Sequence, residues 1–221
     1  MNTIDFGLAP YREIWEMQRK LQNELIAKKK EKKLIKNEYL LVGEHFPVYT
    51  LGFHGNAENL LINEEALKAQ GCECIRIERG GDITFHGPGQ IILYPIIDLE
   101  KHNLGVKAYV SLLEESVLNL LRVYGIKGER VEGATGIWIG KGTREERKIC
   151  AIGVKISRGI SMHGLALNVN TELSAFSAIN PCGFADKGVT SMQKELGRNL
   201  EMEEVKLNLS EIFLTLLEKE I

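Results

Sequence analysis

Hydrophobic residues recur at helical spacing in three long segments of this chain. Residues 10–34, 107–124 and 202–219 each place their apolar side chains near one face of a helix. The residues of these faces are Tyr11, Ile14, Trp15, Leu21, Leu25 and Ile26; Leu112, Leu113, Leu120 and Leu121; and Val205, Leu209, Ile212, Phe213, Leu216 and Leu217. A shorter helix is expected between Asn63, which can cap its first turn, and Gly71, which can end it.

The segments between these helices have the apolar and alternating patterns that are typical of strands. They are EYLLVGEHFPVYTLG, CECIRIE, IILYPIIDL, GIWIG, KICAIGVKIS and LALNVN. Because IILYPIIDL is almost continuously apolar, it is expected to be a strand covered on both faces. The strands mostly do not alternate one-for-one with helices, so a regular doubly wound parallel sheet is not favoured. The pattern predicts an α/β fold: a single domain over residues 1–221, with a mixed β-sheet flanked by helices.

Composition and charge narrow the location and the partners. The chain has 221 residues, 44% of them hydrophobic, and a net charge of −2, which gives no sign of nucleic-acid or membrane binding. The basic run AKKKEKKLIK is more simply the solvated end of the first helix, where cations suit the helix dipole. No apolar run has transmembrane length, and MNTIDFGLAP lacks the features of a signal peptide. A cytoplasmic protein is therefore expected.

The cysteines and histidines do not have the spacing of a metal site. Cys72 and Cys74 are separated by one residue, which is poor both for a disulfide and for paired zinc ligands. The histidines do not form a helical metal-binding pair. In a reducing compartment the thiols are expected to be free, and no metal site is predicted.

The glycine-rich segment RGGDITFHGPGQ, residues 79–90, is the first candidate for a binding site. Its glycines let a ligand approach the main chain, and Arg79, Thr84, His86 and Gln90 add polar groups. The segment is neither a Walker loop, since the GKS or GKT ending is missing, nor a dinucleotide fingerprint. A pair of tight turns is the structural alternative. The density of glycine together with arginine and histidine favours a loop that lines a pocket.

The segment HGLALNVN, residues 163–170, is a second candidate wall. Its alternation predicts a strand with two different faces, and the small Gly164 and Ala166 would leave room for a slender substrate. A lone histidine such as His163 is more often a hydrogen-bonded structural residue than a catalyst.

The segment INPCGFAD, residues 179–186, holds Cys182 between a proline and a glycine. A thiol in this context can be a small buried hydrophobe, half of a disulfide, a metal ligand or a nucleophile. A nucleophilic cysteine needs a base or a cation to favour its thiolate, because the pKa of a free thiol is about 8.5. No Cys–His pairing is evident from the spacing, so a lysine of KICAIGVKIS becomes the candidate partner.

Lys148 and Lys155 lie an odd number of positions apart in that predicted strand, so a regular strand directs them to opposite faces. Lys148 then shares the apolar face, which comprises Cys150, Ile152, Val154 and Ile156, and Lys155 the more open face of Ala151, Gly153 and Ser157. An ammonium group in partly apolar surroundings has a lowered pKa and can exchange protons. A bulge would undo this parity, and a strand-end lysine that extends to water is an equally good interpretation.

Taken together, the motifs RGGDITFHGPGQ, TGIWI, KICAIGV, HGLALNVN and NPCGFADKGVTS resemble the lipoyl(octanoyl) transferase family. The resemblance extends from PYREIWEMQ near the N-terminus to the VTS after Cys182, which is most of the chain. It implies the fold that this family shares with lipoate and biotin protein ligases.

The resemblance also implies a reaction and the residues that perform it. Cys182 would carry octanoate as a thioester, and Lys148 would form a dyad with it. The donor would be octanoyl-acyl carrier protein, and the acceptors would be lipoyl domains of 2-oxoacid dehydrogenase E2 subunits and the glycine-cleavage H protein. No cofactor is implied, and a monomer is expected. The substrate-binding residues would be Arg79, Gly80, Gly81, Asp82, Ile83, Thr84, Phe85, His86, Ala151, Ile152, Gly153, Gly164, Leu165 and Ala166.

Two other functions fit parts of the pattern. An ATP-dependent lipoate or biotin ligase on the same fold would need a lysine but not Cys182. A non-catalytic module that binds a lipoyl domain or a fatty-acyl ligand would never acquire an acyl group. The occurrence of the PCG cysteine together with the KICAIG lysine argues against both.

Overall fold

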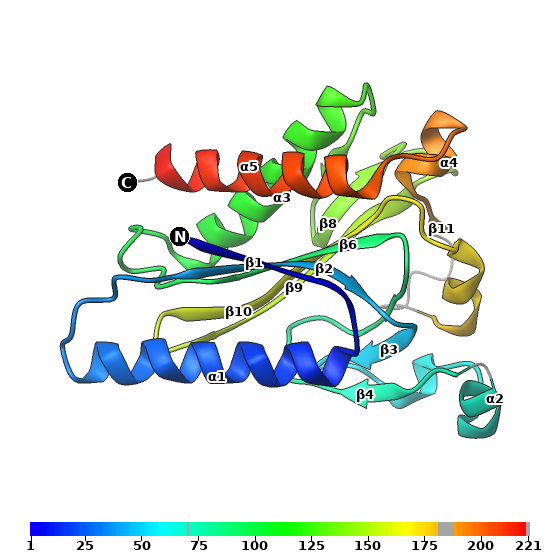
Figure 1. The fold of residues 1–221 in the computed structure, drawn as a ribbon. Helices are drawn as coiled ribbons and strands as arrows, with labels where there is room; N and C mark the ends of the chain where they lie inside the picture. Colours follow the sequence, from blue (N-terminus) through cyan, green and yellow to red (C-terminus); the bar gives the residue numbers. More distant parts are fainter. Residues whose placement is uncertain (70, 181–187, 220–221) are drawn as a thin grey trace.

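The computed structural model describes residues 1–69, 71–180 and 188–219 of the chain (Figure 1). The long helices are α1 (Tyr11–Lys30), α3 (Val106–Val123) and α5 (Met202–Lys219), and the short ones are α2 (Glu64–Ala69) and α4 (Met192–Leu196). The 3₁₀ helices η1 (Ala57–Asn59) and η2 (Leu173–Ala178) lie in the connections. None of the helices formed by the described residues is long and apolar enough to cross a bilayer.

The strands form a large mixed sheet and a small one. The large sheet has the order β1-β2-β6-β10-β9-β8-β7, with β11 beside β9, and the small one has the order β4-β3-β5. Their bounds are β1 (Asn2–Ala9), β2 (Tyr39–His45), β3 (Val48–Leu51), β4 (Cys74–Arg76), β5 (Ile83–His86), β6 (Gln90–Ile96), β7 (Glu129–Val131), β8 (Ala134–Ile139), β9 (Arg147–Ser157), β10 (Ile160–Asn168) and β11 (Gly188–Val189). In the large sheet, β1 pairs with β2 and β11 with β9 in parallel, and the other pairs are antiparallel.

The large sheet has helices on both faces, as Figure 1 shows: α3 and α5 cover one face and α1 covers the other. The main hydrophobic core lies under α3 and α5, and it takes alternate residues of each strand, such as Leu165 and Leu167 of β10. Ala166, between them, packs toward α1 with Ile14. The predicted mixed sheet flanked by helices is therefore confirmed.

Several predicted elements agree closely with the structure. Helix α5 has the predicted bounds, and α3 lies one residue earlier than predicted at each end. The Asn63 side chain caps α2 by accepting a hydrogen bond of 2.8 Å from the Ala66 N–H. Every residue of β6 is buried, as the continuous apolar run predicts for a strand between two layers.

The structure differs from the sequence prediction at the N-terminal strand and at the end of the first helix. Strand β1 was not predicted, because it lies at the edge of the sheet and buries little of its surface. Helix α1 ends at Lys30 rather than at residue 34, since the chain turns at Lys32, whose φ is +55°. Repulsion among consecutive lysines also disfavours a longer helix.

The segment EYLLVGEHFPVYTLG contributes strands to two different sheets. Strands β2 and β3 are separated only by Phe46 and Pro47, where the chain passes from the large sheet to the small one. The small sheet therefore lies beside the α1-covered face of the large sheet, and a cavity forms between them.

Gly164 of β10 allows close packing within the sheet, in addition to the room that its missing side chain leaves in the cavity. A Cβ atom at this position would collide with the backbone carbonyl oxygen of Leu93 in the neighbouring strand β6. A backbone atom in the middle of a sheet cannot move aside without breaking its ladder.

We therefore expect Gly164→Ala to destabilise the fold by about 2–4 kcal/mol, the range of a buried steric conflict. Gly105→Ala is the control, because a Cβ there meets nothing within 4 Å, and its loss of stability should stay within about 1 kcal/mol. Urea unfolding of both variants measures the difference. Equal midpoints for the two variants would contradict this account.

Candidate active site

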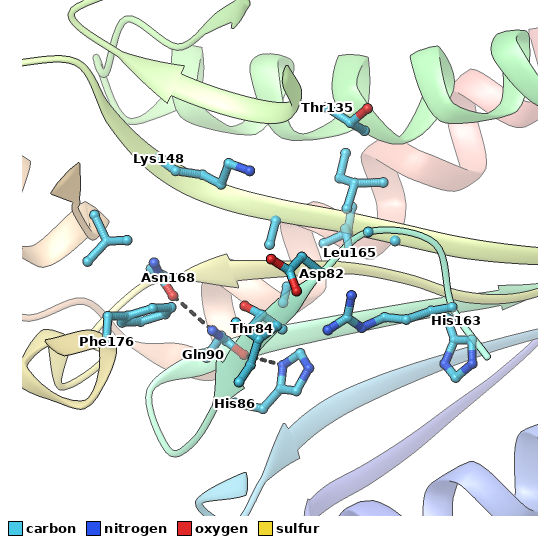
Figure 2. A pocket seen from close by; sticks show the side chains of 18 of the residues that line it. Asp82, Thr84, His86, Gln90, Thr135, Lys148, His163, Leu165, Asn168 and Phe176 are labelled. Atoms are coloured by element: carbon cyan, nitrogen blue, oxygen red, sulfur yellow. Dashed lines mark hydrogen bonds between the residues drawn. The ribbon is translucent and has the colours of Figure 1, made fainter. Parts of the chain in front are cut away.

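The cavity has a volume of about 420 Å³ and lies between strands β6, β9 and β10 on one side and the 79–90 segment with η2 on the other. Figure 2 shows the side chains that line it. Helix α1 contributes Tyr11, and β8 contributes Trp138. At this size the cavity is comparable with small-molecule binding sites, which are about 300–1,000 Å³.

The three motifs predicted to bind substrate come together at this cavity. The predicted residues that line it are Arg79, Gly81, Asp82, Ile83, Thr84, His86, Ala151, Ile152, Gly153, Gly164, Leu165 and Ala166, and the predicted catalytic Lys148 also lines it. Gly80 and Phe85 do not. Phe85 instead packs in the core of the small sheet against Tyr49 and Phe176. Cys182 lies outside the described residues.

The glycine-rich loop approaches β9 so closely that side chains would not fit between them. The Gly80 N–H donates a hydrogen bond of 3.0 Å to the Val154 carbonyl. A Cβ atom on Gly153 would lie 2.8 Å from the Gly80 carbonyl oxygen, and Gly81 adopts a φ of +83°. Gly80 therefore anchors the loop to the sheet, which explains why it lies behind the cavity wall.

Arg79 is held in place by the small sheet. Its guanidinium donates hydrogen bonds to the carbonyl and the hydroxyl oxygen of Thr50, and to the Gly80 carbonyl. The residue is buried and still lines the cavity. Fixed in this way, it supplies a positive charge at a defined position.

A chain of hydrogen bonds runs behind the cavity from Thr50 to β11. The Gln90 side-chain amide donates to the Phe85 carbonyl and, at 2.9 Å, to the Asn168 side-chain oxygen. The Gln90 amide oxygen therefore accepts from His86 Nδ1 at 2.8 Å, and His86 Nε2 accepts from the Thr50 hydroxyl at 3.3 Å. These partners assign His86 as a neutral imidazole protonated at Nδ1. Figure 2 marks the hydrogen bonds that join His86, Gln90 and Asn168.

The same series of hydrogen bonds continues to Thr190, the residue after β11. The Asn168 amide donates to the Thr190 carbonyl at 3.0 Å, and the Thr190 N–H donates to the Lys148 carbonyl at 2.9 Å. Along this series, from Thr50 through Asn168, each side chain donates to the next one toward Thr190. The binding loop and the strand that carries Lys148 are thus connected through satisfied buried groups.

Histidines 45, 86 and 163 are buried and neutral around the cavity. Burial lowers the pKa of His45 to about 4 and that of His163 to about 3, and it lowers the pKa of His86 well below its usual range. The unfolded chain binds protons on these imidazoles near pH 6.5, whereas the folded chain does not.

We therefore expect the free energy of unfolding to fall as pH decreases from about 7 to 4, because the unfolded state then binds more protons. Urea midpoints at pH 7, 6 and 5 measure the slope of the unfolding free energy against pH. His45→Gln should reduce this slope by the contribution of up to about one bound proton. The exposed His54→Gln is the control and should leave the slope unchanged. A midpoint constant over this range would contradict the assignment.

Lys148 reaches the cavity because β9 contains a bulge. Ile137 of β8 pairs with Cys150, but the next residue, Trp138, pairs with Lys148, so Ile149 is an extra residue in β9. Ile149 and Cys150 are both fully buried in the core under α3 and α5.

The predicted face of Lys148 was therefore wrong. The residue lies on the cavity side with Ala151 and Gly153, whereas Cys150 is fully buried in the main core. Its ammonium lies 4.6 Å from the centre of the Trp138 ring, a cation–π contact. The parity argument fails because it requires a regular strand.

The residues on both sides of the 181–187 segment lie at the cavity. Ile179 lines it and forms an isolated bridge with Leu60. Gly188 and Val189 also line it, and Val189 pairs with Lys148 in parallel register. The chain on either side of Cys182 is thus anchored at this site.

Sequence reasoning gave no role to several lining residues, among them Tyr11, Tyr94, Trp138, Asn168 and Phe176. Tyr11, Tyr94 and Trp138 come from elements whose pattern indicates only a buried face, and Phe176 comes from η2, which was not predicted. Asn168 carried a recognisable signal, since a buried amide in an apolar strand requires a polar partner.

Comparison with solved structures shows the class of this fold. A bipartite lipoate protein ligase of Thermoplasma acidophilum superimposes with a TM-score of 0.70 at 18% identity, over 99% of this chain and 84% of that one. The biotin protein ligase of Aquifex aeolicus gives a TM-score of 0.58 at 14% identity, over 99% of this chain and 71% of that one. The predicted biotin/lipoate protein ligase-like fold is confirmed.

Sequence comparison defines the family. The model of the lipoyl protein ligase A/B catalytic domain matches residues 10–214. An octanoyltransferase of Bacteroides fragilis is 50% identical over 218 residues, which cover 98% of each chain. This chain belongs to the lipoyl protein ligase A/B catalytic domain family and, within it, to the octanoyltransferases.

Proposed function

We propose that this protein transfers an octanoyl group from octanoyl-acyl carrier protein to a lysine of a lipoyl domain, through a thioester on Cys182. The observation that carries the proposal is the position of Lys148, which lies at the cavity beside the anchored end of the segment that contains Cys182. The family membership supports the same acyl chemistry.

The length of the chain supports a reacting position for Cys182. It is the third residue after Ile179, which lines the cavity, so its Cα can be at most about 10 Å from that of Ile179. On the other side, the residues that follow the segment are bonded to β9 at Lys148. These chain lengths are compatible with the proposed role of Cys182.

The reaction would proceed in two acyl transfers. The Cys182 thiolate attacks the thioester carbonyl of the donor, the carbon–sulfur bond to the carrier breaks, and the carrier thiol leaves. The lysine amine of the acceptor then attacks the Cys182 thioester, forms an amide and loses a proton, and the carbon–sulfur bond breaks to release the Cys182 thiolate. Covalent catalysis divides one difficult aminolysis into two easier steps, and no nucleotide is consumed.

Lys148 would assist both steps. As a cation it favours the Cys182 thiolate in the first step and gives its proton to the departing carrier thiolate. The neutral Lys148 amine then accepts a proton from the incoming amine in the second step. The cation–π contact with the Trp138 ring would help to hold the Lys148 ammonium at the cavity.

The described cavity suits a slender acyl chain. Ala151, Gly153, Gly164 and Ala166 form a wall of small residues along β9 and β10. The binding residues named from the three motifs would contact the chain there, and Gly80 and Phe85 would act by supporting the loop.

The remaining parts of the proposal concern the setting of the reaction. Residues 1–221 would form one catalytic domain that acts as a monomer in the cytoplasm. Lipoyl domains of 2-oxoacid dehydrogenase E2 subunits and the glycine-cleavage H protein would be the acceptors. The alternative on this fold is an ATP-dependent lipoate or biotin ligase, which does not require Cys182.

Intact-protein mass spectrometry after mixing with octanoyl-acyl carrier protein, without ATP, tests the thioester. We expect one octanoyl increment that hydroxylamine removes and that Cys182→Ser abolishes. Cys74→Ser is the matched control and should keep the increment, since Cys74 is a half-buried thiol in the small sheet. Acceptor labelling that appears only with ATP would establish the ligase instead.

A lysine substitution tests the dyad. Lys148→Met should lower the rate of octanoyl transfer by about 100-fold or more, the contribution of a positioned acid–base group. Lys155→Met removes a lysine from the same strand that instead pairs with Glu78 at 3.1 Å, and it should retain the wild-type rate. A wild-type rate in Lys148→Met would remove this residue from the mechanism.

A further inference from the structure

Lys148 lies in a part of β9 that the sheet itself supports weakly. Only Arg147 precedes it in the strand, and the bulge at Ile149 follows it. On one side it pairs with Trp138, next to that bulge, and on the other with Val189 of β11, a strand of two residues. Bulges and very short strands supply few ladder hydrogen bonds against the entropy of ordering the chain. The direction of the Lys148 side chain, which Figure 2 shows entering the pocket, therefore depends on further contacts of its backbone.

The residue before Lys148 is held by an ion pair with helix α4. Arg147 Nε donates to Glu195 Oε1 at 2.7 Å, and Arg147 Nη2 donates to Glu195 Oε2 at 2.6 Å. The two side chains are 24% and 15% exposed. These hydrogen bonds hold the pKa of Glu195 below its usual range, so the pair is ionised at neutral pH. A bidentate pair of this kind fixes orientation as well as distance.

Thr190 connects the same carboxylate to Lys148 from the other direction. Its hydroxyl donates to Glu195 Oε1, and its N–H donates to the Lys148 carbonyl at 2.9 Å. Thr190 is fully buried, where an unmade hydrogen bond is costly. Glu195 is therefore linked to the backbone of Lys148 along the chain, through Arg147, and across the strand pair, through Thr190.

Helix α4 holds Glu195 in place independently of this ion pair. Met192, in its first turn, is fully buried in the main core. The Gln193 N–H donates to the carbonyl of Val169, the residue after β10, at 2.8 Å. The carboxylate of Glu195 thus extends from a support that is fixed to the core and to the end of β10.

We propose that Glu195 is a positioning residue for octanoyl transfer: by binding Arg147 and Thr190 together, it fixes the backbone of Lys148 so that the Lys148 ammonium lies at the cavity. Glu195 does not line the cavity that the described residues form, so it would act through Lys148 and not on the substrate. It also lies outside the sequence motifs that predict the site. This inference rests on the proposed acyl transfer and adds a residue to it.

The kinetics of Glu195 variants test the proposal. In Glu195→Met, kcat for octanoyl transfer should fall by about tenfold, the effect of losing a hydrogen bond between charged groups. The KM for octanoyl-acyl carrier protein should stay within about twofold, because no substrate contact is removed. Glu195→Gln keeps an acceptor oxygen for Thr190 and should recover part of the loss.

Glu73→Met is the matched control for these kinetics. Glu73 also accepts from two guanidinium nitrogens of one arginine, Arg12, but it joins α1 to the chain beside the small sheet. This variant should keep the wild-type kcat. An equal fall of kcat in Glu73→Met and Glu195→Met would overturn a specific role of Glu195.

The reactivity of Cys182 separates positioning from a general loss of stability. Site-resolved alkylation against pH measures the pKa of this thiol, which the Lys148 ammonium should hold below the free value of about 8.5. In Glu195→Met the pKa should rise toward that value, as it should in Lys148→Met. A lower stability alone leaves it unchanged while the protein stays folded. A wild-type kcat and a wild-type Cys182 pKa in Glu195→Met would overturn the proposal.

Hydrogen exchange tests the contact without any acyl transfer. Because the Thr190 N–H donates to the Lys148 carbonyl, its exchange should be about tenfold faster in Glu195→Met and unchanged in Glu73→Met. Exchange at the wild-type rate in Glu195→Met would overturn the link between this carboxylate and Lys148. Wild-type protein that forms no octanoyl thioester would instead contradict the proposed reaction, and the faster exchange would still support the link.

Discussion

The extra residue in β9 is the constraint on which the candidate site depends. A strand between two layers must direct alternate residues to each layer, and β9 does so from Ala151 onward. The bulge at Ile149 resets this alternation, so that two consecutive residues fill the core under α3 and α5. Lys148 is thereby turned to the cavity. Without the bulge, the same sequence would place its ammonium in the main hydrophobic core, at a large cost in desolvation.

The polar groups behind the cavity follow a related rule. Buried amides and imidazoles are stable only when each donor finds an acceptor, and the residues from Thr50 through Asn168 achieve this with all donors in one direction. This series of hydrogen bonds connects the small sheet, the large sheet and the residue after β11. His163 departs from this rule, because its ring has no hydrogen-bond partner among the residues that the structure describes and its backbone φ is positive. A departure from good local structure at a binding site is typical of a functional residue.

The sequence predicted much of the candidate site because its motifs lie on neighbouring strands. Residues 151–153 and 164–166 face each other across the β9–β10 pairing, and the glycines of the 79–90 loop allow it to lie against β9. Lys148 was chosen correctly as a cavity residue, but on the wrong face of its strand. Tyr94 and Trp138 were missed, since a buried aromatic residue has the same sequence pattern in a core and in a cavity wall.

By itself, the sequence determined the elements whose side chains alternate strongly between burial and exposure, or are buried throughout. These are α3, α5 and β6, together with the mixed α/β class. Tertiary structure decided what depends on partners distant in the chain: the edge strand β1, the division of β2 and β3 between two sheets, the bulge at Ile149 and the left-handed backbone of His163. The physical reason is that periodicity in the sequence indicates only which face of a helix or strand is buried. Pairing register and close backbone approach are instead set by strands and helices that are distant in the sequence and pack against that element.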